Sequence, residues 1–187
     1  AGAVTWMNGS NGQLVGGTSG TITSTNSLIG STIGDNVGVD AVSLTNGNYV
    51  VRSIYWNNGT ATKAGAVTWC NGATGTTGIV SSANSLVGST KEDYVGSSSI
   101  YALGNGHYVV ASPLWDNDTV VNVGAVTWGD GSTEGTRLIG NVTTTNSLHG
   151  TLQNDCVGGG GITVLTGVNK NNYVVRTPYW DNGTSVV

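Results

Sequence analysis

The chain has 187 residues, of which 31 are Gly and 9% are charged, and its formal net charge is −4. The scarcity of charged helix-forming residues argues against a helical bundle or coiled coil, and a 37% hydrophobic content argues against a charge-driven disordered chain. Six basic residues spread over the whole length cannot form a phosphate-binding stripe, and no apolar run is as long as a membrane helix. We therefore expect one all-β domain that binds no nucleic acid and does not insert into a membrane.

Internal repetition is the strongest feature of the sequence. Three motifs occur three times each: Gly-Ala-Val-Thr-Trp from Gly2, Gly65 and Gly124; Asn-Ser-Leu from Asn26, Asn84 and Asn146; and Tyr-Val-Val from Tyr49, Tyr108 and Tyr173. A Trp follows each Tyr of the third motif by seven residues, and an Asp follows each Asn of the second by nine. The single repeat domain, 1–187, therefore divides into three units in circular permutation. The first unit is 1–38 joined with 157–187, the second is 39–96, and the third is 97–156.

The second unit shows the expected elements in chain order. Alternating residues predict a strand at Val39–Leu44, and Asn46-Gly47 predicts a type I′ hairpin turn into a partner strand at Tyr49–Trp56. Gly65–Trp69 reads as a short third strand, and Ile79–Val87 as a fourth. No segment has the pattern of a helix, so each unit is predicted to form four short antiparallel strands.

Repeated four-stranded units are typical of β-propeller blades. We predict a β-propeller-type fold with three four-stranded antiparallel blades. Since common propellers have four to eight blades, the three would belong to a larger ring or oligomer. A trefoil or prism and an open solenoid array remain as alternatives.

The repeats also resemble those of known families. The run from Asn46 to Gly59, with Ala-Gly-Ala-Val-Thr-Trp after it, resembles repeats of large secreted bacterial haemagglutinin- or adhesin-like proteins. More distantly the layout is similar to integrin-type FG-GAP blades, with Ser112-Pro113 and Thr177-Pro178 at the place of the Ala-Pro. The Asp-X-Asp-X-Asp-Gly calcium loop of FG-GAP repeats is missing. The resemblance implies propeller blades and an extracellular, adhesion-related setting.

The turn after each Tyr-Val-Val strand is the candidate ligand site. It joins an aromatic ring to amide or carboxylate groups in every copy: Trp56 and Asn57, Trp115 and Asp116, Trp180 and Asp181. Such pairs can stack and hydrogen-bond sugars, and in a ring the three turns would share one face with the indoles partly accessible. Packing of these rings between units is the competing interpretation.

Other candidate groups favour structural roles. Asp35, Asp93 and Asp155 recur at one turn, where a carboxylate is expected to cap the backbone. His107 and His149 stand at non-equivalent positions without a nucleophile or carboxylate partner in sequence, so we predict no enzyme, no metal site and no cofactor. Cys70 and Cys156 could form a disulfide or remain two thiols.

Two functions from different classes follow. One is a secreted or cell-surface binding module, adhesin- or lectin-like, that recognises a glycan or host surface. The other is a structural repeat of a filament or spacer without a specific ligand. In both cases we expect self-association or further repeats in a longer chain.

Overall fold

The computed structural model describes residues 1–17 and 20–183 and forms four small β-sheets. The first contains β1 (Ala3–Val4), β2 (Leu28–Ile29) and β6 (Gly78–Ile79). The second contains β3 (Asp40–Ser43), β4 (Tyr49–Ser53), β5 (Ala66–Cys70), β7 (Leu86–Val87) and β11 (Gly140–Asn141). The third contains β8 (Ser99–Ala102), β9 (Tyr108–Ser112), β10 (Ala125–Gly129) and β12 (Ser147–His149). The last is the hairpin of β13 (Ile162–Val164) and β14 (Tyr173–Val175).

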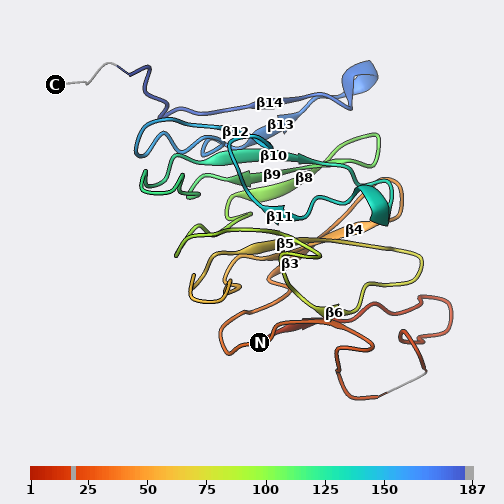
Figure 1. Ribbon diagram of the computed structural model, residues 1–187. Coiled ribbons are helices and arrows are strands. Elements are labelled where there is room, and N and C mark those ends of the chain that lie inside the picture. The colour runs from red at the N-terminus through yellow and green to blue at the C-terminus, as the bar shows by residue number, and fades with distance from the viewer. Residues whose placement is uncertain (18–19, 184–187) are drawn as a thin grey trace.

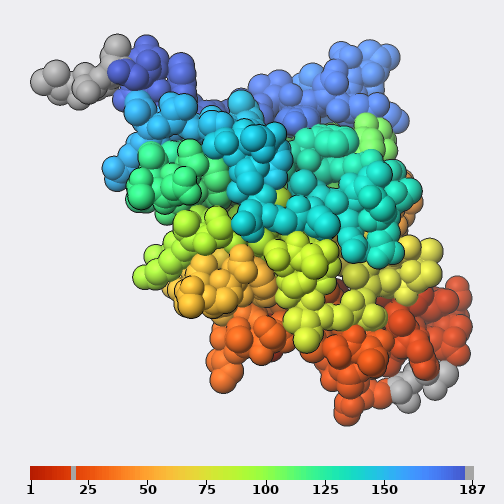
Figure 2. All heavy atoms as spheres, in the orientation of Figure 1, coloured from red at the N-terminus to blue at the C-terminus, as the bar shows by residue number. Residues whose placement is uncertain are grey.

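The sheets lie on one another as layers, in chain order. Figure 1 shows the first sheet at one end of the stack and the β13–β14 hairpin at the other, and Figure 2 shows the same layering in the packed atoms. The only helical turns in the described residues are the 3₁₀ turns η1 (Glu134–Thr136) and η2 (Gly167–Asn169). The all-β prediction is therefore confirmed.

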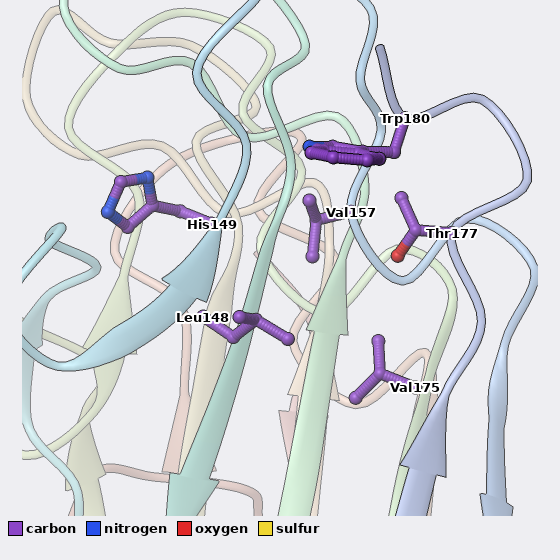
Figure 3. A pocket seen from close by; sticks show the side chains of 6 residues that line it. All are labelled: Leu148, His149, Val157, Val175, Thr177 and Trp180. Atoms are coloured by element: carbon purple, nitrogen blue, oxygen red, sulfur yellow. The ribbon is translucent and has the colours of Figure 1, made fainter. Parts of the chain in front are cut away.

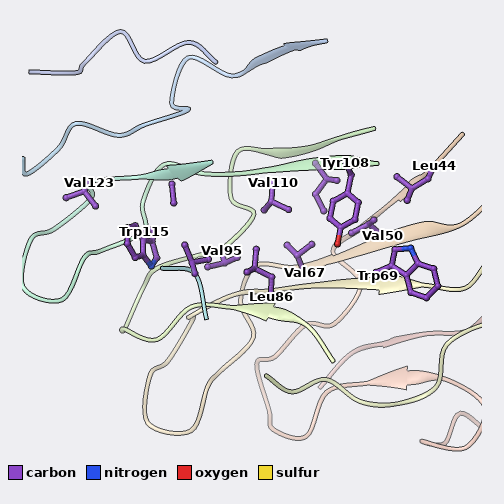
Figure 4. Packing of buried hydrophobic residues seen from close by; sticks show 13 residues of the cluster. Leu44, Val50, Val67, Trp69, Leu86, Val95, Tyr108, Val110, Trp115 and Val123 are labelled. Atoms are coloured by element: carbon purple, nitrogen blue, oxygen red, sulfur yellow. The ribbon is translucent and has the colours of Figure 1, made fainter. Parts of the chain in front are cut away.

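The inner strands are buried on both faces because each inner sheet has a neighbour above and below. In β4, Val50 packs toward the third sheet and Val51 toward the first, and both are fully buried. The largest cluster lies between the second and third sheets (Figure 4), with Trp115 near one end and Trp69 and Tyr108 near the other. Because these strands are buried on both faces, Tyr-Val-Val does not alternate between apolar and polar residues.

The predicted four antiparallel strands per unit are present in each inner sheet, in the order β3-β4-β5-β7 and β8-β9-β10-β12. The single fourth strand predicted at Ile79–Val87 is wrong, because the segment divides into β6 and β7. Gly78–Ile79 pairs in parallel with β2 of the preceding sheet, and β11 pairs in the same way with β7. The units 39–96 and 97–156 therefore each add a short edge strand to the preceding layer.

The β3–β4 turn also differs from its prediction. Gly47 has a φ of +88°, but Asn46 is outside the left-handed region that a type I′ turn requires at both central residues. The Leu44 N–H bonds to the Asn48 carbonyl and the Gly47 N–H to the Leu44 carbonyl, so the loop contains three residues and ends on a left-handed Gly.

The described residues form an open stack and do not close into a ring (Figure 1). The described residues of 1–38 and of 157–187, two segments that were predicted to form one unit, contribute strands to separate sheets at opposite ends. Closure depends on the rotation between neighbouring sheets, which strand number alone does not determine.

Candidate functional site

The three recurrent Trp-Asn/Asp turns lie in different environments. Trp56 and Trp115 are only 4% and 3% exposed, whereas Trp180 is 58% exposed. The expectation of partly accessible rings is thus wrong for the first two and holds for the third. Trp56 packs with Leu28 of the first sheet, and Trp115 with Leu86 of the second, so each ring lies in the core between two layers.

The polar residues after these Trp residues take part in a contact between layers. The backbone N–H groups of Asn57, Asp116 and Asp181 donate to Asp35, Asp93 and Asp155, over 3.2, 3.0 and 3.0 Å. Each of these buried carboxylates also accepts two backbone N–H groups of its own turn, such as Ser89 and Thr90 for Asp93. The recurrent Asp therefore caps its turn, as expected, and it also holds the following layer, which the sequence did not predict.

The side chains of Asn57 and Asp116 accept hydrogen bonds from backbone groups of their own loops. The Asn57 side-chain oxygen accepts the Lys63 N–H at 2.9 Å, and the Asp116 carboxylate accepts the Asn122 N–H at 2.7 Å. These bonds explain why both inner turns have a side chain with an acceptor oxygen at this position, and no ligand is needed for that explanation.

Burial and hydrogen bonding act in opposite directions on the recurrent carboxylates. Burial raises the pKa of Asp35, but hydrogen bonds from Thr32 and Asn57 outweigh it and hold the pKa below the usual value. The pKa of Asp155 is likewise lowered, because backbone hydrogen bonds outweigh the effect of burial. At Asp93 burial is the larger effect and raises the pKa despite the bonds from Thr90, Asp116 and Ser89.

A polar cleft of about 250 Å³ adjoins the middle turn. Its walls are Ser89, Trp115, Asp116, Asn117, Asp118, Asn141, Val142, Thr143 and Thr144. The Trp115 indole N–H is buried without a hydrogen-bond partner among the described atoms. Sequence reasoning found Trp115 and Asp116 but missed Asn141, Thr143 and Thr144, which come from a segment 25 or more residues later and carry no local signal.

A second cavity of about 250 Å³ lies beside Trp180 at the end of the stack. Figure 3 shows the indole above Val157, with Thr177 beside it and Leu148 and Val175 below; His149 completes the lining. Except for His149 and Thr177 the lining is apolar. Sequence reasoning missed Leu148, Val157 and Val175, although their counterparts in the second and third units are the core residues Leu86, Val95 and Val110.

The Trp residues of Gly-Ala-Val-Thr-Trp also contact the following unit. The Trp6 indole N–H donates to the Gly72 carbonyl at 2.9 Å, and the Trp69 indole to the Gly131 carbonyl at 3.0 Å. Trp69 is 3% exposed and lies in the core, but Trp128 is 46% exposed. Its ring instead stands edge-on to His107, 5.0 Å away between centroids.

In the described part of the chain, titratable groups outside these turns form no metal centre. His107 Nδ1 lies 3.1 Å from an Asp130 carboxylate oxygen, a pair that sequence reasoning missed. Within residues 1–17 and 20–183, no three His, Cys, Asp or Glu residues are grouped so that they could hold a metal ion. Cys70 and Cys156 are unpaired thiols, and burial raises the pKa of Cys70 to about 12. The part of the chain that the structure describes has no helix suited to crossing a membrane.

Comparison with known proteins identifies the repeats. A family model described as "Repeat of unknown function (DUF5650)" matches four segments, 1–39, 43–97, 102–159 and 167–186. No curated protein and no solved structure matches the chain. The match does not link the repeats to haemagglutinin-like or FG-GAP proteins.

Proposed function

The chain belongs to this repeat family, and from that premise we propose that it is a non-catalytic structural array, a spacer whose length is set by the number of stacked units. The observation that carries the proposal is the burial of Trp56 and Trp115 between layers. The residues that recur in every unit are used to fasten one layer to the next, through apolar packing and through the Asp35 and Asp93 caps. A secreted or cell-surface location remains part of this proposal.

A spacer built from nearest-neighbour contacts should tolerate a change in unit number. Deletion of residues 39–96 would place the third sheet on the first, where Val110, Trp115 and Ala125 replace Val51, Trp56 and Ala66. The shortened chain is expected to fold and, by small-angle X-ray scattering in dilute solution, to be shorter by one sheet spacing of about 10 Å. Duplication of 39–96 should lengthen it equally. Unfolding, or an unchanged length, would contradict the proposal.

Carbohydrate binding is the second candidate function, and the polar cleft favours it. Asp116 stands there with Asn117, Asn141, Thr143 and Thr144, side chains that can hydrogen-bond a sugar, and the lining also includes Trp115, which is 3% exposed. Of the predicted ligand residues, Trp56, Asn57, Trp180 and Asp181 lie outside this cleft. A lectin role would therefore rest on the turn at Trp115 and Asp116 alone. A propeller ring would need further repeats to form.

A glycan array separates these two functions. The cleft proposal expects binding that Thr144→Ala and Asn117→Ala weaken, with unfolding curves unchanged because both residues lie at the cleft surface. Ser10→Ala, in an exposed loop of the first unit, is the matched control. The absence of binding to any glycan would eliminate the lectin proposal and leave the spacer proposal intact.

A further inference from the structure

In residues 1–17 and 20–183, the two ends of the stack lack complementary parts of one unit. In the inner sheets β4 pairs with β3 and β5, and β9 pairs with β8 and β10. Among the described residues β14 pairs only with β13, and β1 pairs only with β2. Since β14 corresponds to β4 and β1 to β5 in the repeat, each end holds the strand that the other is missing.

The pocket beside Trp180 has a filled counterpart at both inner interfaces. Val80 and Val142 each stand four residues before the Asn of Asn-Ser-Leu. They are 2% exposed and pack in the clusters that contain Trp56 and Trp115, respectively. The residue at the same position in the first unit is Ile22, which is 64% exposed at the other end of the molecule. Among the described residues, one end of the stack therefore exposes an apolar side chain, and the other end has the unfilled pocket into which its counterparts fit.

We propose that the β14 end of one molecule binds the β1 end of a second copy of this chain, head to tail, and so completes the repeat unit. The register follows from the β4–β5 pair, in which Tyr49 faces Cys70 and Ser53 faces Ala66. By the same pairing Tyr173 faces Met7 of the second copy, and Thr177 faces its Ala3. Ile22 of the second copy then enters the pocket formed by Leu148, Val157 and Trp180.

A second contact supports the same arrangement. The glycines whose carbonyls accept the Trp6 and Trp69 indoles stand three residues after the Trp of their own unit. Gly9 has this position in the first unit. In the proposed assembly the exposed Trp128 indole would donate to Gly9 of the second copy, and its ring would become buried as Trp69 is. Because the contact is head to tail, a pair of molecules keeps one free end of each kind, so further molecules can add and extend the stack.

This inference goes beyond the spacer role and does not depend on it, since a glycan-binding array could assemble in the same way. It is tested with two variants that each block one end. Ile22→Asp places a charge on the side chain that enters the pocket, and Leu148→Asp places one in the pocket. Both residues are more than half exposed in the single molecule, so both variants should fold, which circular dichroism and urea unfolding will check.

Sedimentation velocity over a roughly hundredfold range of concentration gives the readout. The parent chain should form species larger than 18.9 kDa that grow with concentration, and each variant alone should stay monomeric. A mixture of the two variants should give a dimer that grows no further, because each supplies one intact end. Ile33→Asp is the matched control: Ile33 is 98% exposed and its counterparts are Lys91 and Gln153, so this variant should assemble like the parent.

Three results in sedimentation would overturn the proposal. The first is a parent chain that stays monomeric at every concentration. The second is a pair of folded variants that do not associate when mixed. The third is loss of association in only one variant, which would indicate a symmetric contact between like ends. In the mixed dimer, slowed hydrogen exchange at both β1 and β14 should accompany association, and its absence would likewise contradict strand pairing.

Discussion

Inner and outer copies of the same motif can lie in opposite environments in this molecule. Trp115 and Trp180 close the same turn, yet one is 3% and the other 58% exposed. Leu86 and Leu148 follow the same Asn-Ser pair, yet one is fully buried and the other 57% exposed. The sequence motif thus encodes a surface that fits a neighbouring layer, and the position in the stack decides whether that surface is covered. Exposure at an end is therefore weak evidence for a ligand site.

Substitution of Trp115 and Trp180, which are equivalent in the repeat, should give the largest difference in unfolding free energy between an inner and an outer copy. Trp115→Ala removes a core ring between two layers and should lower the free energy of unfolding by about 3–5 kcal/mol. Trp180→Ala removes an exposed ring and should cost less than about 1 kcal/mol. Urea unfolding at concentrations too low for association measures both. Equal losses would mean that the end layer is covered in solution.

Glycine substitutions should sharpen the same contrast at the backbone. A Cβ at Gly72 would overlap the Gly47 carbonyl oxygen of the neighbouring turn, whereas a Cβ at the equivalent Gly9 meets nothing within 4 Å. Gly72→Ala should therefore destabilise the fold by about 1–3 kcal/mol. Gly9→Ala should be neutral or slightly stabilising, because it only restricts the unfolded chain. Thermal unfolding compares the two, and similar midpoints would argue against close packing at Gly72.

Much of the layer itself was predictable from the sequence. Tyr-Val-Val and Ala-Val-Thr-Trp form the inner antiparallel strands as expected, because alternation, β-branched residues and turn signals act locally. The parallel edge strand β6 was not predictable, since two residues, Gly78 and Ile79, carry no periodicity and their partner belongs to the preceding unit. The turn type failed for a local reason, because Asn46 adopts an ordinary negative φ and leaves the left-handed conformation to Gly47.

The candidate site was predictable only in part. The sequence identified the recurrent Trp turns but could not say which copies are covered, because Val80 and Val142, which cover Trp56 and Trp115, come from segments more than 20 residues later in the chain. Likewise the cap role of Asp93 could be expected from its recurrence, but its bond to Asp116, 23 residues later, depends on how the layers stack.

The smallest expected effect concerns the recurrent carboxylates and pH. The pKa of Asp35 is lowered in the fold, so its charged form stabilises the protein above its unfolded pKa of about 3.9, and this contribution is lost as the pH falls through the folded value. The pKa of Asp93 is raised, so its contribution is complete below the unfolded pKa and is lost as the pH rises through the folded value. The two carboxylates therefore act on acid stability in opposite directions.

Replacing one Asp at a time by Asn removes the titration of that carboxyl group and leaves the other in place. Both Asp35→Asn and Asp93→Asn weaken a cap at neutral pH, so the informative quantity is the change in unfolding free energy between pH 7 and pH 3, relative to the parent. Asp35→Asn should lose less stability than the parent on acidification, because the group that resists protonation is gone. Asp93→Asn should lose more, because the parent gains from protonating that buried carboxyl. Urea unfolding at the two pH values decides the signs, and the same sign for both variants would show that the inner layer does not desolvate its carboxylate more than the end layer does.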